Sequence, residues 1–125
     1  MSQNRRTLGQ AAERLAEALF CEMGFDILFR NWRRPQAEID LVALKDGVCV
    51  FVEVRSRTGQ EHGHALETVT RAKRAQVVRA ARLFLSEETP PGAREFRFDV
   101  VAVTFDEMGA VAERLHVPAA FDTNE

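Results

Sequence analysis

The dipeptide Asp46-Gly47 is the feature that most restricts how this chain can fold. It lies between two largely apolar runs, residues 37–45 and 48–56. Asp-Gly in such a position is the strongest short signal of a β-hairpin, with both residues in a type I′ turn. The turn pairs the residues that flank it and so sets the register of the hairpin. Since both strands are apolar on both faces, we expect helices to cover the sheet on both sides.

The segments around the hairpin predict those helices and two further strands. Residues 7–23 carry apolar side chains at three-to-four spacing, which predicts an amphipathic helix that Gly24 ends. A second helix, basic on one side, is predicted for residues 69–86, and strands are predicted for residues 25–33 and 96–105. The order helix, three strands, helix, strand, with helices expected on both sides of the sheet, predicts an α/β sandwich.

Composition and length are typical of one soluble globular domain, with 46% apolar and 29% charged residues in a chain of 125. We expect a core at about residues 7–105 and a weakly patterned acidic tail at 106–125, with one more strand or short helix around 111–117. The sequence shows neither a membrane span nor a secretory segment, so a cytoplasmic location is expected. Cys21 and Cys49 are too few for a disulfide framework, and we interpret both as buried thiols.

Four charged side chains interrupt the hairpin near its outer ends. In the register set by the turn, Asp40 lies opposite Glu53 and Glu38 lies opposite Arg55, all on one face. Two carboxylates about 5 Å apart repel by roughly 3 kcal/mol at an effective dielectric of about 20. Protonation of one acid, neutralisation by Arg55, or a divalent cation such as Mg²⁺ would offset this cost. The alternative is a structural cluster, in which Glu38 pairs with Arg55 beside a solvated Asp40.

The charge is distributed unevenly along the chain. The net charge is −2, yet residues 1–105 hold 16 basic and 14 acidic groups, whereas residues 106–125 hold one basic and five acidic groups. Fifteen of the 17 basic residues are arginine, whose planar fork of donors suits phosphate. If some of the acids bind a metal, the remaining surface is basic. The alternative for the basic side of the helix at 69–86 is an ordinary solvated face.

Several short motifs occur together in a set order. They are "G-x3-E-x2-A" (Gly9, Glu13, Ala16), "GF-x-IL-x-RN-x-R" (24–33), "EIDLVA" (38–43), "VFVEVRSR" (50–57), "G-x-A" (Gly63, Ala65), Lys73 and "RFDVVAV" (97–103). The pair "EID" and "EVR" resembles the core of PD-(D/E)XK nucleases. The whole string resembles the YraN-like family of uncharacterised bacterial proteins over residues 7–105. That family is similar in fold to restriction endonucleases and archaeal Holliday junction resolvases. The resemblance therefore implies a restriction-endonuclease-like three-layer sandwich, with a mixed central sheet flanked by helices.

The resemblance also implies roles for individual acids. Asp40 and Glu53 would be the metal ligands, for Mg²⁺ or Mn²⁺. Glu38 would be an accessory acid, and Glu13 matches an acidic position that the resolvases place near the metal. The implied activity is metal-dependent hydrolysis of phosphodiester bonds in DNA, branched or single-stranded, and a homodimer is expected because resolvase-like enzymes act as dimers.

Arg55 stands at the lysine position of the motif, where members of the family vary between lysine and arginine. Because arginine stays protonated, it cannot act as a general base, but it can hold a hydroxide or a phosphate oxygen. Lys73, in the predicted basic helix, could supply the ammonium group instead. The residues expected to contact the DNA backbone are Arg30, Arg33, Arg34, Arg57, Arg71 and Arg74.

Two other functions stay open. The chain could be a nucleic-acid-binding protein that keeps the nuclease fold without activity, which the arginine at the lysine position favours. It could also be a protein-interaction domain with an incidental ion-pair cluster. Among other polar or aromatic residues, His62 and His64 are interpreted as plain loop residues, Trp32 as a half-buried strand residue rather than a base-stacking one, and Asp99 as a structural hydrogen-bond or ion-pair partner.

Overall fold

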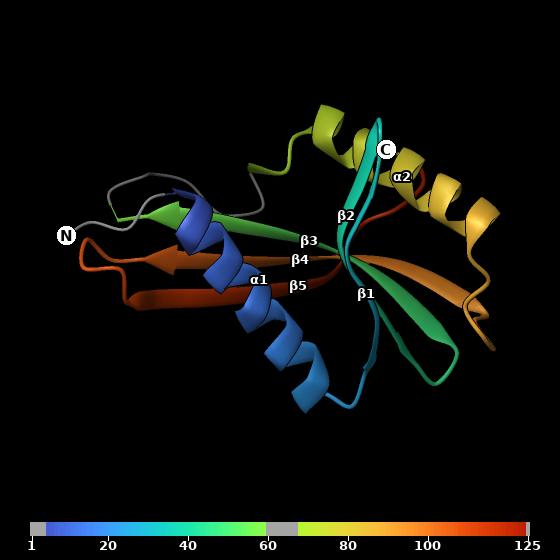
Figure 1. Cartoon of the computed structure of the whole chain (residues 1–125), viewed down its shortest axis with the longest axis horizontal. Coiled ribbons are helices and arrows are strands. Elements are labelled where there is room, and N and C mark those ends of the chain that lie inside the picture. Colours follow the sequence, from blue (N-terminus) through green and yellow to red (C-terminus); the bar gives the residue numbers. More distant parts are fainter. Residues whose placement is uncertain (1–4, 60–67, 125) are drawn as a thin grey trace.

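The structure is a computed structural model of the chain, and it describes residues 5–59 and 68–124 (Figure 1). In chain order the elements of these residues are α1 (Arg5–Glu22), β1 (Asp26–Arg34), β2 (Ala37–Lys45), β3 (Val48–Thr58), α2 (Arg71–Glu87), β4 (Glu95–Phe105) and β5 (Val111–Phe121). Within the same two ranges, no helix is long and apolar enough to cross a membrane.

The strands form one mixed sheet in the order β1-β2-β3-β4-β5. Neighbouring strands are antiparallel except β3 and β4, which are parallel. A parallel pair needs a crossover connection, and α2 lies between these two strands in the chain. The predicted α/β sandwich with a mixed sheet is therefore confirmed, with one strand more than the expected order contained.

The additional strand, β5, occupies the tail for which the sequence predicted only a short strand or helix. It runs over Val111–Phe121 and pairs with β4. As an edge strand it leaves most of its side chains exposed, and Phe121 is its one buried residue. The hydrophobic pattern is weak there because pairing with the backbone of β4, more than side-chain burial, keeps this strand in the sheet.

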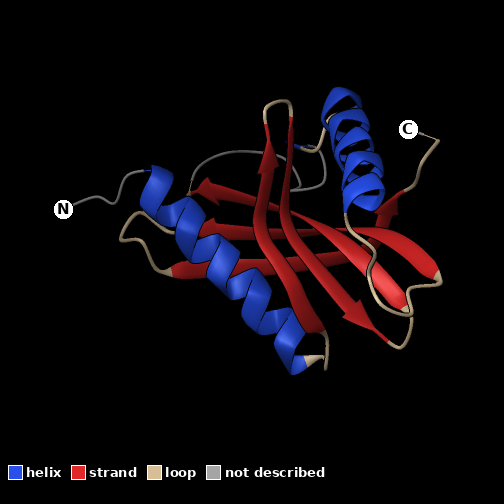
Figure 2. Ribbon diagram, turned by 45° about the vertical axis from the view of Figure 1, so that its right-hand side comes forward, coloured by secondary structure: helices blue, strands red, loops and turns tan. Residues whose placement is uncertain are grey.

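The two helices cover opposite faces of the sheet and bury two separate cores (Figure 2). The buried side chains of α1 recur every fourth residue, and they are Leu8, Ala12, Ala16 and Phe20. Those of α2 are Val77, Val78, Ala80, Ala81 and Phe84. Side chains of β2, β3 and β4 enter both cores, which explains why the central strands are apolar on both faces.

The turn between β2 and β3 has the predicted geometry. Asp46 and Gly47 have φ of 50° and 80°, as a type I′ turn requires. The predicted register holds from the turn as far as the pair Leu41–Val52. Outside the hairpin, Nη2 of Arg94 donates a hydrogen bond to the carbonyl of Asp46 at 3.1 Å, so the residue just before β4 holds the turn.

Gly47→Ala is expected to lower the free energy of unfolding by about 1–2 kcal/mol. The backbone of Gly47 is left-handed, and an added Cβ would lie 2.7 Å from Cζ of Arg94. Urea unfolding measures the change. Gly9→Ala is the matched control, because a Cβ at this position of α1 meets open space and should add about 0.5–1 kcal/mol. Unchanged stability of Gly47→Ala would contradict the assigned turn.

Candidate active site

The sheet forks at the end of the β2–β3 ladder. The last pair of that ladder is Leu41–Val52. Beyond it, β2 stays paired with β1, whereas β3 stays paired with β4 (Figure 1). The strands therefore separate just before Asp40 and Glu53. A continued ladder would hold these two like charges directly opposite each other, and the separation relieves that repulsion.

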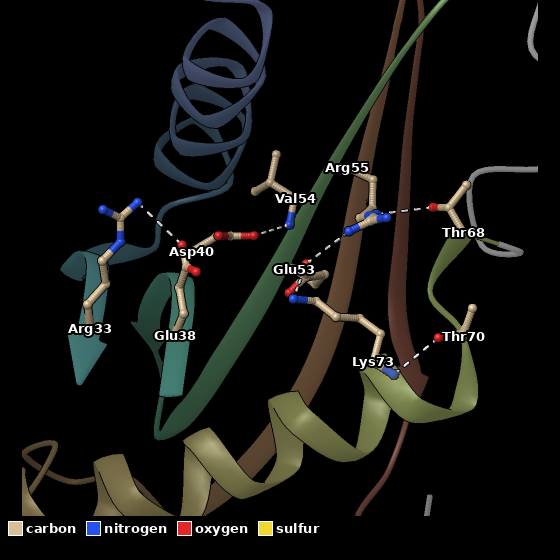
Figure 3. Close-up of polar contacts among 9 residues, drawn as sticks. All are labelled: Arg33, Glu38, Asp40, Glu53, Val54, Arg55, Thr68, Thr70 and Lys73. Carbon is tan, nitrogen blue, oxygen red and sulfur yellow. Dashed lines mark hydrogen bonds and ion pairs between the residues drawn. The ribbon is translucent and has the colours of Figure 1, made fainter. Parts of the chain in front are cut away.

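The accessory acid Glu38 pairs with Arg33 and not with Arg55. Glu38 lies opposite Arg33 in the β1–β2 ladder, and its Oε1 is 3.3 Å from Nη2 of that arginine (Figure 3). Both side chains are largely exposed, so this ion pair contributes little to stability. The predicted pairing of Glu38 with Arg55 is therefore wrong, because at this level the strand partner of β2 is β1 alone.

Asp40 spans the fork with its side chain. Its Oδ2 accepts a hydrogen bond of 2.8 Å from the backbone N–H of Val54, so a side chain takes the place of the lost strand pairing. Burial, followed by the charge of Glu53, raises the pKa of the Asp40 carboxyl to about 7. The charges of Glu13 and Glu38 add to this rise in pKa, and the hydrogen bond from Val54 opposes it. The fork thus gathers the four acids predicted for the site and favours a cation beside them.

Glu53 is the most buried acid of this cluster, at 4% exposure. Its Oε1 lies 3.6 Å from Nζ of Lys73 and 3.7 Å from Nη1 of Arg55 (Figure 3). Burial raises the pKa of the Glu53 carboxyl, and the charges of Lys73 and then Arg55 oppose this rise. Arg55 is held in turn by Thr68, whose Oγ1 accepts a 3.2 Å hydrogen bond from its Nε. Arg55 and Lys73, the two candidates for the role of the motif lysine, therefore both contact the carboxylate of Glu53.

Lys73 reaches the fork from the first turn of α2. Thr70 caps this helix, and its Oγ1 accepts a hydrogen bond of 3.2 Å from the backbone N–H of Lys73. The first turn contains no acidic residue, although acids are favoured there. It carries Arg71, Lys73 and Arg74 instead, whose charges add to the positive end of the helix dipole. This end of α2 therefore attracts anions to the side of Glu53.

Two cavities adjoin the fork from opposite sides of the sheet. The α1 cavity, about 280 Å³, is lined by Glu13 and Glu17 of α1 and by Arg30 and Asp40 of the strands. The hairpin cavity, about 460 Å³, lies between residues 33–38 of the β1–β2 hairpin and residues Lys73, Gln76, Val77 and Arg79 of α2. The α1 cavity is lined by three acids and, with Arg14, two arginines, whereas the hairpin cavity is lined by four basic residues and one acid.

The arginines predicted to contact DNA do not form one patch. Arg33 and Arg34 line the hairpin cavity, and Arg71 and Arg74 lie in the first turn of α2. Arg30 lies on the α1 side and forms an ion pair with Glu17, and Arg57 is half-buried near the end of β3. The first four of these arginines therefore flank Lys73, whereas Arg30 and Arg57 lie apart from them.

Three contributors to the site were not predicted. The backbone N–H of Val54 and the hydroxyl of Thr68 reach Asp40 and Arg55 only in the folded chain. No local sequence pattern predicts either contact. Gln76 lines the hairpin cavity one helical turn after Lys73. Its spacing of three residues from Lys73 places both on one helix face, and this signal was available in the sequence.

The other residues singled out in the sequence have structural roles where the structure describes them. Trp32 is buried at 4% exposure against Phe84, and its base-stacking alternative is excluded by that burial. Asp99 is fully buried and accepts hydrogen bonds from Arg97, as interpreted. Cys49 is buried, but Cys21 is exposed because it lies on the outer face of α1, so that interpretation was wrong. His62 and His64 lie outside the described residues.

The carboxylates of the fork fit a divalent cation as a two-ligand site. Among residues 5–59 and 68–124, no group of three or more His, Cys, Asp and Glu residues is arranged to hold a metal. Mg²⁺, however, is often bound by one or two carboxylates that leave several positions to water and substrate phosphate. Asp40 and Glu53 supply such a pair, and burial raises the pKa of both carboxyls, which a cation between them would reverse.

Fold and site together define the class of protein: a three-layer α/β sandwich with a cluster of acids, lysine and arginine in the fork of its mixed sheet. The chain belongs to the uncharacterised protein family UPF0102, whose model matches residues 12–103. This is the YraN-like family predicted from the motifs.

Relatives in this family match along nearly the whole chain. A UPF0102 protein of Roseiflexus castenholzii is 38% identical over 122 residues, which cover 98% of both chains. One of Syntrophotalea carbinolica is 40% identical over 124 residues, or 99% of this chain and 98% of the relative. One of an Anaeromyxobacter species is 47% identical over 106 residues, or 85% of this chain and 79% of the relative.

Proposed function

We propose that the protein is a metal-dependent nuclease that hydrolyses phosphodiester bonds in DNA. The observation that carries this proposal is the fork itself, where Asp40 and the buried Glu53 lie beside Lys73 and Arg55. Such an arrangement offers acids for a cation and cations for a phosphate within one site. The resemblance to Holliday junction resolvases adds branched DNA as a substrate and a homodimer as the working assembly.

Each residue of the fork has a separate task in this proposal. Asp40 and Glu53 would hold a Mg²⁺ or Mn²⁺ ion together with the backbone carbonyl of Val54, and Glu13 and Glu38 would add negative charge nearby. When bound, such an ion supplies Lewis-acid chemistry that activates water and polarises the phosphoryl group. The hydrogen bond from the N–H of Val54 keeps the Asp40 carboxylate oriented, which limits the reorganisation needed for catalysis.

Lys73 and Arg55 stabilise the charge that develops on the phosphate. Lys73 has three mobile donors on a flexible stem, whereas the guanidinium of Arg55 is anchored by Thr68. Arg55 stays protonated, so neither the proton abstraction nor the attack depends on it as a base. Arg33, Arg71 and Arg74 hold the flanking backbone through contacts that depend on salt and not on sequence.

Lys73→Ala is expected to lower the maximal cleavage rate about 100-fold to 1000-fold, the usual effect of removing one donor to a developing anion. Arg55→Lys should keep most of the activity, because it restores the residue found in the nuclease motif. Single-turnover cleavage at saturating Mn²⁺ measures both rates. Arg82→Ala, an exposed site further along α2, is the control for lost charge. Full activity of Lys73→Ala would remove Lys73 from the mechanism.

Raising the pH from about 6 to about 8 is expected to strengthen Mn²⁺ binding about tenfold. A carboxyl must lose its proton to bind a metal, and burial raises the pKa of Asp40 to about 7, so the ligand forms within this range. Isothermal titration calorimetry at the two pH values measures the affinity. Asp40→Asn should bind weakly at both. Equal affinity of the wild type at both pH values would contradict a raised pKa for an Asp40 that binds the ion.

Cleavage assays test the proposed function itself. Wild-type protein with Mg²⁺ or Mn²⁺ should cut branched or single-stranded DNA, and Asp40→Asn should not, with EDTA as the second control. The alternative, a binding protein without activity, is favoured by one observation: Lys73 and Arg55 already neutralise Glu53. DNA binding that depends on salt, without metal-dependent cleavage of any of these substrates, would establish that alternative.

A further inference from the structure

We propose that the hairpin cavity holds one unpaired nucleotide next to the bond that is cleaved, so that the protein selects single-stranded segments of DNA. This inference rests on the proposed nuclease function and names the substrate of that site. The volume of about 460 Å³ lies in the range of pockets that enclose a small organic molecule. A single nucleotide fits such a space, whereas a base in a duplex can enter only after it leaves the stack.

The walls of the hairpin cavity offer the contacts that a nucleotide needs. Arg79 brings positive charge for phosphate, as does Arg33 beside its ion-pair partner Glu38. The amides of Gln36 and Gln76 can each donate to and accept from a base edge. No residue of the described ranges forms a hydrogen bond with either amide side chain. Val77 and Ala37 supply the apolar part of the lining. A purely phosphate-binding surface would need the charges but not the amides.

The hairpin wall of this cavity is held in place without a ligand. Arg34 contacts Oε1 of Glu87 through Nε at 2.8 Å and Nη2 at 2.7 Å, which ties the hairpin to the last turn of α2. Its Nη1 donates to the carbonyl of Arg33 at 2.7 Å, and its guanidinium lies 4.3 Å from the centre of the Trp32 ring. A wall formed in advance reduces the entropy cost of binding.

Lys73 links the hairpin cavity to the carboxylate site. Lys73 lines the cavity and also lies 3.6 Å from Oε1 of Glu53. Lys73, Gln76 and Val77 share one face of α2, since they are three and four residues apart. A strand whose base enters between Gln36 and Gln76 therefore brings its adjoining phosphate toward Lys73 and Glu53. The cavity thus acts as a specificity site beside the proposed catalytic centre.

Fluorescence anisotropy in EDTA tests this inference without any cleavage. A labelled single-stranded oligonucleotide should bind at least about tenfold more tightly than the blunt duplex of the same sequence. The double variant Gln76→Ala with Arg79→Ala should lose about tenfold in affinity for the single strand and much less for the duplex. Arg82→Ala, also on the exposed side of α2 but outside the cavity, is the matched charge control. Gln36→Ala on the opposite wall gives an independent variant if the first does not fold.

The outcomes separate this inference from the proposed function. Equal affinity for single strand and duplex would overturn the nucleotide site, even if duplex DNA is cut on adding Mn²⁺. An equal loss of single-strand affinity in Arg82→Ala and in the cavity variant would also overturn it, since only general charge would then matter. A single-strand preference that depends on the cavity, with no cleavage on adding Mn²⁺, would support the site and contradict the nuclease.

Discussion

Asp40→Asn is expected to stabilise the metal-free protein above neutral pH, on the order of 2 kcal/mol, while lowering metal-dependent cleavage at least about 100-fold. The asparagine keeps an oxygen that can accept the hydrogen bond from Val54 but has no charge to place beside Glu53. A metal ligand is lost at the same time. Stability and activity should therefore change in opposite directions, as is common at sites where like charges are held together.

The effect on stability should depend on pH in a defined way. The pKa of the Asp40 carboxyl is about 7 in the fold, above its ordinary value of 3.8. Between these values the folded protein keeps a proton that the unfolded chain has lost, so rising pH favours the unfolded state. The advantage of Asp40→Asn should thus be small near about pH 4 and complete above about pH 7.

Urea unfolding in EDTA at about pH 5 and about pH 8 measures this advantage. Asp26→Asn, at an exposed position of β1, is the control and should change stability little at either pH. Saturating Mn²⁺ should make the wild type more stable than Asp40→Asn at pH 8, because the ion binds the folded wild type and stabilises it by mass action. A lower stability of metal-free Asp40→Asn at pH 8 would show that the hydrogen bond from Val54 to the Asp40 carboxylate outweighs the cost of its buried charge.

Asp99→Ala is expected to lower the free energy of unfolding by about 3 kcal/mol or more. Asp99 is fully buried and accepts two hydrogen bonds from Arg97, at 2.8 and 2.9 Å. Its Oδ2 lies 2.8 Å from Nε2 of His116, and its Oδ1 accepts a 3.0 Å hydrogen bond from the backbone N–H of Ala119. Removal of the carboxylate leaves these donors without their common acceptor in the interior.

Asp99 also holds β5 where its pairing with β4 is irregular. The register shifts between Phe98 and Val100, and Ala119, opposite this shift, has a φ of 50°. Urea unfolding measures the loss, and Asp122→Ala, at an exposed position after β5, is the control. The variant should still cut DNA at the wild-type rate under conditions where it is folded. A full loss of activity in folded Asp99→Ala would give this acid a catalytic role that its position does not explain.

The sequence was sufficient wherever local chemistry decides the structure. The Asp46-Gly47 turn, the apolar register of the hairpin and the two amphipathic helices all depend on residues close in the chain. It was insufficient at the fork, because the separation at Leu41–Val52 depends on the competing ladders of β1 and β4. A register that extends beyond the last apolar pair assumes that no other strand competes for it.

For the candidate site, too, the sequence predicted the residues but not all of their contacts. Asp40, Glu53 and Lys73 were predicted as its members, but the contact of Lys73 with Glu53 depends on how α2 crosses from β3 to β4. The edge strand β5 was predicted only as a short strand or helix for a related reason, since its main partners are the backbone of β4 and the buried Asp99. Hydrophobic periodicity reports burial and does not report such contacts.

The most direct test of the account is where a divalent ion binds. A crystal soaked in Mn²⁺ would be measured at a wavelength where manganese scatters anomalously. We predict one anomalous peak between the carboxylates of Asp40 and Glu53, and its absence from a crystal of Asp40→Asn treated in the same way. A wild-type crystal with no peak at the fork, or with Mn²⁺ bound only elsewhere, would contradict the assignment of these two acids as metal ligands.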